Sequence, residues 1–181
     1  MRIISGKARG TKLYTLDGLE TRPTLDRVKE SLFNIINDRI YDSSVLDLFS
    51  GSGAIGLEFI SRGAKEAVLC DNSKKAIDII RKNAEKTHLE DKVEIYNLNF
   101  EKMIEKLKNK KFDFIFLDPP YKTNHIKDAI KLIKQYNILN ENGMIIAETD
   151  EVEKAKTQLY ELNANILDIR KYGRIYLIFI L

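Results

Sequence analysis

The chain contains one cysteine, no tryptophan, two histidines and three prolines among its 181 residues. A single cysteine, Cys70, excludes an internal disulfide and fits a reducing cytoplasm. So few cysteines and histidines argue against a structural zinc site, and we expect no metal ligands. No apolar run is long enough to cross a bilayer, and the first residues lack the apolar segment of a signal peptide. The sequence therefore predicts a cytoplasmic protein that makes no membrane contact.

The net charge of +3 is too small to indicate nucleic-acid binding by itself, but its distribution is uneven. Four basic residues precede the first acidic residue of the chain: Arg2, Lys7, Arg9 and Lys12. Gly6 and Gly10 punctuate this segment, which predicts a short basic hairpin. It is either a solvated arm, which the composition alone favours, or an arm that contacts phosphates. We therefore divide the chain into a basic N-terminal β-hairpin appendage at residues 1–20 and a main domain at residues 21–181.

Short β-rich runs alternate with helical patterns along the main domain. The expected strands span residues 45–49, 67–70, 93–98, 112–117, 144–147, 165–169 and 175–180. Apolar residues at helical spacing predict helices over residues 24–36, 54–62, 76–84, 126–136 and 152–162. This alternation predicts an α/β fold with a mostly parallel sheet that is covered on both faces. The last two strands form an antiparallel hairpin, which we expect to place one antiparallel strand at the edge of the sheet.

A glycine-rich turn at residues 51–56 follows the first expected strand and precedes a helix. Its G-x-G-x-x-G pattern suits NAD, FAD or S-adenosylmethionine, because backbone without a Cβ can approach a ligand closely. Asp47 separates these cofactors, since an anion there would repel a pyrophosphate and attract the ammonium of a methionine moiety. Asp71 ends the next strand, where a carboxylate can accept both ribose hydroxyls of any of the three. Asp47 could equally be a solvated strand-end acid, and Asp71 a helix cap.

Asp118-Pro119-Pro120-Tyr121 follows the apolar run 112–117 and is the most informative motif. The prolines prevent this loop from extending the sheet, because they lack an amide proton and have a fixed φ. The Asp118 carboxylate and the Pro119 carbonyl are then free to accept hydrogen bonds, and Tyr121 supplies a flat face. Two acceptors beside a ring suit a planar base with an exocyclic amino group. The simpler alternative is a strand-ending turn in which Tyr121 packs on the loop.

Together these motifs resemble the RsmD family of class I S-adenosylmethionine-dependent methyltransferases. Residues 2–13 and 21–34 narrow the resemblance to this family. Those enzymes methylate the N2 amino group of a guanine in small-subunit (16S) ribosomal RNA. The resemblance implies a Rossmann-like fold with a small N-terminal β-hairpin, and a methyltransferase domain at residues 21–181. It also implies S-adenosylmethionine as the cofactor and an assembled or partly assembled ribosomal particle as the partner.

The resemblance further implies roles for individual residues. Catalytic contacts are implied for Asp118, Pro119, Pro120 and Tyr121. Cofactor contacts are implied for Asp47, Phe49, Gly51, Ser52, Gly53, Asp71, Asn72, Asn99 and Phe100. RNA contacts are implied for Arg2, Lys7, Arg9, Lys12 and Arg22. Asn99 departs from the family pattern, in which an acid often contacts the adenine amino group; asparagine still accepts through its carbonyl oxygen but lacks the charge.

Other functions stay open on the sequence. An NAD-dependent oxidoreductase would explain the glycine turn but would leave residues 118–121 without a role. A DNA methyltransferase acting on the amino group of adenine or cytosine would use the same four residues. A non-catalytic RNA-binding module with a vestigial cofactor fold is the third alternative. No feature of the sequence indicates an oligomeric state, and we expect a monomer.

Overall fold

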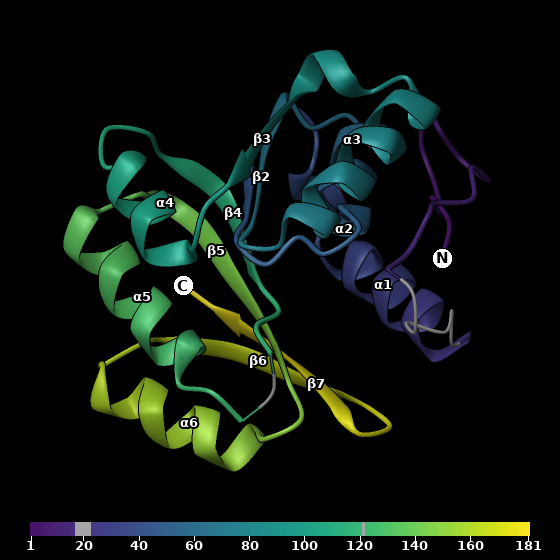
Figure 1. Ribbon diagram of the computed structural model, residues 1–181. Coiled ribbons are helices and arrows are strands. Elements are labelled where there is room, and N and C mark those ends of the chain that lie inside the picture. Colours follow the sequence, from purple (N-terminus) through teal and green to yellow (C-terminus); the bar gives the residue numbers. More distant parts are fainter. Residues whose placement is uncertain (17–22, 121) are drawn as a thin grey trace.

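Helices cover both faces of one central sheet, which gives the protein three layers (Figure 1). The computed structural model describes residues 1–16, 23–120 and 122–181, and within the first helix no side chain before Asp26. None of the helices in these ranges combines the length and the apolar character that crossing a membrane requires. The α/β class with a mostly parallel sheet is confirmed.

The sheet has the strand order β3-β2-β1-β4-β5-β7-β6. Its strands are β1 (Ser44–Asp47), β2 (Glu66–Asp71), β3 (Val93–Asn97), β4 (Phe112–Leu117), β5 (Leu139–Thr149), β6 (Ile166–Tyr172) and β7 (Ile175–Ile180). Strands β1 to β5 pair in parallel, and the order reverses between β1 and β4. Such a reversal opens a crevice at the carboxyl ends of the two strands, which is where open α/β sheets bind ligands.

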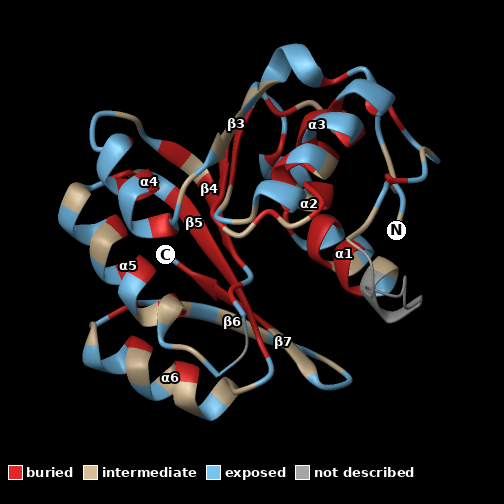
Figure 2. Cartoon of the chain, in the orientation of Figure 1, coloured by how far each residue is buried: buried red, intermediate tan, exposed pale blue. Residues whose placement is uncertain are grey.

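Among the described residues, three α-helices lie on each face of the sheet. The first face is covered by α1 (Pro23–Ile35), α2 (Ala54–Ser61) and α3 (Lys74–Thr87), and the second by α4 (Phe100–Lys106), α5 (His125–Tyr136) and α6 (Val152–Glu161). Short 3-10 helices follow α1 and α3, η1 (Asn37–Arg39) and η2 (Glu90–Lys92). Figure 2 shows that the central strands and the inner faces of the helices are buried, whereas the edge strands β3 and β6 are partly exposed.

Side-chain alternation along the parallel strands decides which residues reach which face. Phe114 and Phe116 of β4 pack with α1 to α3, while Ile115 and Leu117 pack with α4 to α6. Because both faces are buried, these strands are nearly continuous apolar runs, and the sequence located them well. By the same alternation, the face of the sheet to which a polar residue at the end of such a strand points can be predicted from its position in the strand.

The C-terminal hairpin differs from the expectation in one respect. The antiparallel strand β7 lies inside the sheet, between β5 and β6, and β6 forms the edge. The prediction that an antiparallel strand ends the sheet was therefore wrong. Burial gives the reason, because Leu177 to Ile180 of β7 are fully buried whereas β6 alternates between half-buried and exposed residues. The more apolar of the two strands takes the interior position.

The helical spacing of Leu25, Val28, Leu32, Ile35 and Ile36 predicts that they share one apolar face of α1. The Leu25 side chain lies outside the described part of the chain. Val28, Leu32 and Ile36 are buried as expected, but Ile35 is 44% exposed. Phe33 is buried in place of Ile35, against the ring of Phe59 at 4.8 Å. The helix α4 was not predicted at all, because seven residues are too few for a helical period to stand out.

The N-terminal residues form a hairpin that packs on the main body. Arg2 bridges Lys12 in antiparallel fashion, and the backbone N–H of Ile3 donates to the carbonyl of Thr11 at 3.0 Å. Ile3 is fully buried and shares the core on the α1–α3 side. Gly6 has a φ of +84°, and a Cβ there would lie 1.8 Å from the backbone oxygen of Ser61. Only glycine permits this close approach to α2.

Candidate active site

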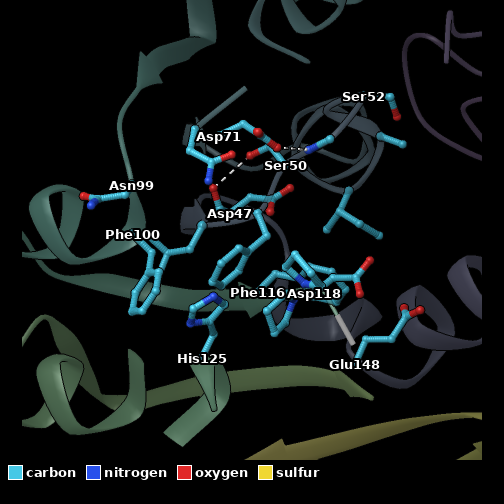
Figure 3. Close-up of a pocket in the computed structure, with 18 of the residues that line it drawn as sticks. Asp47, Ser50, Ser52, Asp71, Asn99, Phe100, Phe116, Asp118, His125 and Glu148 are labelled. Atoms are coloured by element: carbon cyan, nitrogen blue, oxygen red, sulfur yellow. Dashed lines mark hydrogen bonds between the residues drawn. The ribbon is translucent and has the colours of Figure 1, made fainter. Parts of the chain in front are cut away.

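A cavity of about 650 Å³ opens at the carboxyl ends of the central strands (Figure 3). Most of the residues predicted to bind the cofactor or the substrate line it: Asp47, Phe49, Gly51, Ser52, Asp71, Asn72, Asn99, Phe100, Asp118, Pro119 and Pro120. Gly53 is not among the lining residues, and Tyr121 and Arg22 lie outside the described residues. The glycine turn and the Asp-Pro-Pro segment, 62 residues apart at their nearest in the chain (from Gly56 to Asp118), therefore share one cavity.

Asp47 ends β1 and is 1% exposed. Its Oδ1 atom has no hydrogen-bond partner among the described residues. Burial, together with the negative charge of Asp118 and then of Asp71, raises the pKa of Asp47 to about 8. A buried carboxylate with a free oxygen is costly unless a cation or a donor binds there. Its chemistry fits the ammonium group of S-adenosylmethionine.

The turn after β1 is held in a shape that glycine favours. Gly51 and Gly53 have φ values of 53° and 77°, in the left-handed region. Gly53 begins α2 as its N-cap, and a Cβ there would lie 3.2 Å from Ile80 of α3. Ser50, which the sequence analysis missed, ties the turn to β2, because its hydroxyl donates to the Asp47 carbonyl and accepts from the Cys70 N–H. Gly53 therefore shapes the turn beside the cavity.

Asp71 receives two backbone hydrogen bonds. Its Oδ2 accepts from the N–H of Gly51 at 2.9 Å, and its Oδ1 accepts from the N–H of Ser73 at 2.8 Å. The residue that caps α3 is Ser73, whose hydroxyl accepts from the Ala76 N–H at 3.4 Å. The two hydrogen bonds thus hold the Asp71 carboxylate in place, and Asp71 is not the N-cap of α3. Each of its oxygens keeps a lone pair with which to accept a hydroxyl group.

Asn99 has a structural contact that the sequence did not reveal. Its Oδ1 accepts from the N–H of Lys102 at 3.1 Å and caps α4. The oxygen expected to contact adenine is therefore already engaged with the helix, although a second lone pair is left. Asparagine is one of the residues preferred at a helix N-cap, which explains its presence at this position.

Aromatic rings form one wall of the cavity. The ring of Phe49 lies 5.3 Å from that of Phe100 and 6.1 Å from His125, and Phe100 lies 5.1 Å from His125. Figure 3 shows His125 and Phe100 on the same side of the cavity. His125 was missed because it comes from the start of α5, and no spacing in the sequence connects it to the phenylalanines. A flat aromatic wall suits an adenine ring.

Carboxylates gather on the other side of the cavity. Asp118 follows β4, and Glu148 lies near the end of β5. Asp118 is open to the cavity but surrounded by its walls, and this burial raises its pKa to about 7. Burial and the charge of Asp118 raise the pKa of Glu148 to about 8. Glu148 was missed as a site residue, although it closes an apolar strand just as Asp47 and Asp118 do.

The basic residues of the hairpin lie outside the cavity. The hairpin runs from Met1 at the cavity to the C-terminal end of α2, where the Lys7 N–H donates to the Ser61 carbonyl at 2.8 Å. Met1 lines the cavity, and the Ser52 hydroxyl lies 3.8 Å from its sulfur. Lys7, Arg9 and Lys12 are exposed. Arg2 is also exposed, and its guanidinium lies 3.8 Å from Asp26 of α1. In the described part of the chain, no three His, Cys, Asp or Glu side chains are arranged to hold a metal ion.

The fold and this site define a class I S-adenosylmethionine-dependent methyltransferase. The chain belongs to the RsmD family, whose model, described as conserved hypothetical protein 95, matches residues 1–181.

The similarity to known proteins covers most of the chain. A candidate rRNA methyltransferase of Bacillus subtilis, YlbH, is 40% identical over 160 residues, which are 87% of each protein. Ribosomal RNA small subunit methyltransferase D of Haemophilus influenzae is 35% identical over 179 residues, 95% of this chain and 93% of that protein. The solved structure of a candidate methyltransferase from Escherichia coli, yhhF, has a TM-score of 0.83 at 28% identity, covering 99% of this chain and 96% of that one.

Proposed function

We propose that this protein transfers a methyl group from S-adenosylmethionine to the N2 amino group of a guanine in small-subunit ribosomal RNA. One observation carries the proposal: the Asp47–Gly53 turn and Asp118 face the same cavity from neighbouring parallel strands. A methyl donor held by the turn would then meet a base held at Asp118. The relative in Haemophilus influenzae, which is named for small-subunit rRNA, supports the choice of substrate.

The residues around the glycine turn suit the cofactor. Asp47 can pair with the ammonium of the methionine moiety, and Asp71 can accept ribose hydroxyls. Phe49, Phe100 and His125 offer a flat wall for adenine. When bound, S-adenosylmethionine supplies a methyl group on a positively charged sulfur, which is the electrophile of the reaction. The chain's own task is to orient this group toward the base.

Asp118 and the Pro119 carbonyl act on the target nitrogen. The exocyclic nitrogen of guanine is a weak nucleophile, because its lone pair is delocalised into the ring, and it is far too weak an acid for a carboxylate to deprotonate it. Two acceptors that bind its two N–H groups disfavour the planar nitrogen and direct its lone pair toward the methyl group. Catalysis then consists of orientation and of electrostatic stabilisation of the cation that develops at nitrogen.

The proton leaves the nitrogen as the methyl group arrives or afterwards. Asp118 is suited to relay it, because burial raises its pKa to about 7 and its side chain is open to the cavity. A carboxylate with such a pKa takes up a proton near neutral pH and returns it to water.

The basic hairpin provides a surface for the RNA backbone. Its cations are exposed, and the hairpin starts at Met1, which lines the cavity, so phosphates neutralised along this surface would position the target base. The base must leave its stack to reach Asp118, as RNA-modifying enzymes require. We propose that Tyr121 stacks on it and that Arg22 joins the RNA surface. A small chain has little area with which to choose one base, which favours an assembled or partly assembled ribosomal particle as the substrate.

The alternatives fit the site less well. An NAD-dependent oxidoreductase would place a pyrophosphate near the buried carboxylate of Asp47. A DNA methyltransferase acting on adenine or cytosine would use the same Asp-Pro-Pro segment, and it is the second candidate.

Product analysis separates these candidates. The protein is incubated with methyl-labelled S-adenosylmethionine and with small ribosomal subunits from cells that lack it, naked small-subunit rRNA, or duplex DNA. The nucleosides are then separated. We expect labelled N2-methylguanosine at one position of the small-subunit rRNA. Labelled N6-methyladenine or N4-methylcytosine in DNA would replace this proposal by the second candidate.

A further inference from the structure

Glu148 and Asp118 stand side by side at the cavity. Strands β4 and β5 are parallel and in register, with Leu117 opposite Ala147, so the next residue of each chain segment is a carboxylic acid. Leu117 and Ala147 both face α4 to α6, and alternation turns Glu148 toward the opposite face, where Asp47 also lies. Figure 3 shows the side chains of Asp118 and Glu148 next to each other. Both residues line the cavity.

The surroundings of Glu148 do not explain its burial. Only 8% of the residue is exposed, and its partner across the sheet is the apolar Leu177. None of the described residues donates a side-chain or loop hydrogen bond to its carboxylate. The other charged residues that line the same cavity are Asp47, Asp71, Glu101, Asp118 and Lys29. Lys29 is the one cation among these lining residues, and its ammonium already lies 3.0 Å from Glu58. A buried acid beside another acid is unfavourable unless a ligand brings donors to both.

The Watson–Crick edge of guanine supplies such donors. Its N2 amino group and its N1–H lie next to each other, so the base presents two neighbouring donor positions. Adenine and cytosine present their amino group next to a ring nitrogen that accepts a hydrogen bond instead. Two neighbouring acceptors in the protein therefore match guanine and leave an acceptor facing an acceptor with the other two bases.

We propose that Glu148 accepts the N1–H of the target guanine while Asp118 accepts from its amino group. Glu148 is then a specificity-determining residue that touches the substrate base. This inference rests on the proposed function and adds the reason why guanine, and not another amino-bearing base, is selected.

The test removes the N1–H from the base and the charge from Glu148. Small subunits are reconstituted with rRNA that carries either guanine or 2-aminopurine at the mapped position, because 2-aminopurine keeps the amino group but has an acceptor at N1. The wild-type protein and Glu148→Gln are compared by kcat/KM on both substrates. Glu153→Gln, an exposed glutamate on α6, is the matched control. Binding of S-adenosylmethionine checks that each variant is folded.

We expect the wild-type protein and Glu153→Gln to prefer guanine roughly 10- to 100-fold, which is the scale of one good base-edge contact. Glu148→Gln should lose most of this preference, because an amide can present either its oxygen to N1–H or its NH2 to an N1 acceptor. An unchanged preference in Glu148→Gln, or a wild-type protein without any preference, would overturn the role of Glu148.

A second variant keeps the test decisive if Glu148→Gln does not fold. Glu148→Asp retains the charge but withdraws it by one methylene, so methylation of guanine should slow while that of 2-aminopurine does not. Equal slowing on both substrates would overturn the inference. Failure of the proposed function looks different, because the wild-type protein would then produce no N2-methylguanosine in small-subunit rRNA.

Discussion

The ammonium of Lys29 lies 3.0 Å from a carboxylate oxygen of Glu58, and both side chains are almost completely buried. The Glu58 carboxylate also accepts from the backbone N–H groups of Ile4 and Ser5 and forms an ion pair with Arg62 at 2.8 Å. Burial lowers the pKa of Lys29, although the charge of Glu58 opposes this shift. Glu58 thus joins the hairpin, α1 and α2 beside the cavity that Lys29 lines.

Replacing Glu58 by alanine should lower the free energy of unfolding by about 3–5 kcal/mol, because it leaves two buried cations and two backbone donors without their partner. Urea denaturation measures this difference. Glu153→Ala is the control, since Glu153 is exposed and its ion pair with Lys156 contributes at most about 1 kcal/mol. Equal stability of the two variants would contradict the role of Glu58.

The free carboxylate of Asp47 predicts a pH dependence of stability without the cofactor. Its pKa is raised to about 8, so the folded state holds a proton that the unfolded state loses near the ordinary aspartate pKa of 3.8. The free energy of unfolding should therefore fall as the pH rises between these two values and level off above about 8. Asp47→Asn removes the buried charge and should reduce the slope of this part of the profile, while the raised pKa values of Asp118 and Glu148 keep a slope of the same sign.

At about pH 9, Asp47→Asn should be more stable than the wild type by about 1–3 kcal/mol. It should also bind S-adenosylmethionine much more weakly, because it cannot pair with the ammonium. Chemical denaturation across a pH series and calorimetry with the cofactor measure the two effects. A variant that is destabilised at high pH, or that binds the cofactor normally, would disagree with this assignment of Asp47.

The hairpin cations should act on RNA and not on the cofactor. Replacing Lys7, Arg9 and Lys12 together by alanine should weaken rRNA binding and reduce the slope of log affinity against log salt by about 2 to 3. These side chains are exposed, so the dissociation constant for S-adenosylmethionine should not change. Alanine at Lys108, Lys110 and Lys111, near the start of β4, serves as a control of equal charge. An identical salt slope for both triple variants would exclude the hairpin as the RNA surface.

Much of the sheet could be predicted from the sequence, since strands buried on both faces are bounded apolar runs. Asp47, Asp71 and Asp118 could be located for the same reason, because each ends such a run. The parts that could not be predicted depend on tertiary contacts. His125 meets Phe100 only through the packing of α4 and α5, and the Asn99 cap belongs to a helix too short to show a period.

The position of β7 was not predicted, because the hairpin pattern is the same whichever of its two strands pairs with β5. The more apolar sequence of residues 175–180 was the signal that could have placed this strand inside the sheet. The buried ion pair of Lys29 is a related case. Lysine on a helix usually indicates a solvated face. Here Glu58 of α2 makes its burial favourable, together with the Arg2 carbonyl, to which the ammonium also donates. Whether such a residue is buried depends on its partners in the folded protein and not on its neighbours in the sequence.

The central claim is that one cavity holds the methyl donor at Asp47 and the target base at Asp118. The rate of a single methyl transfer by Asp118→Ala, saturated with S-adenosylmethionine, tests it most directly, using small subunits as the substrate. The rate should fall by roughly 100- to 1000-fold, while calorimetry shows cofactor affinity close to that of the wild type. A wild-type transfer rate in this variant would contradict the account.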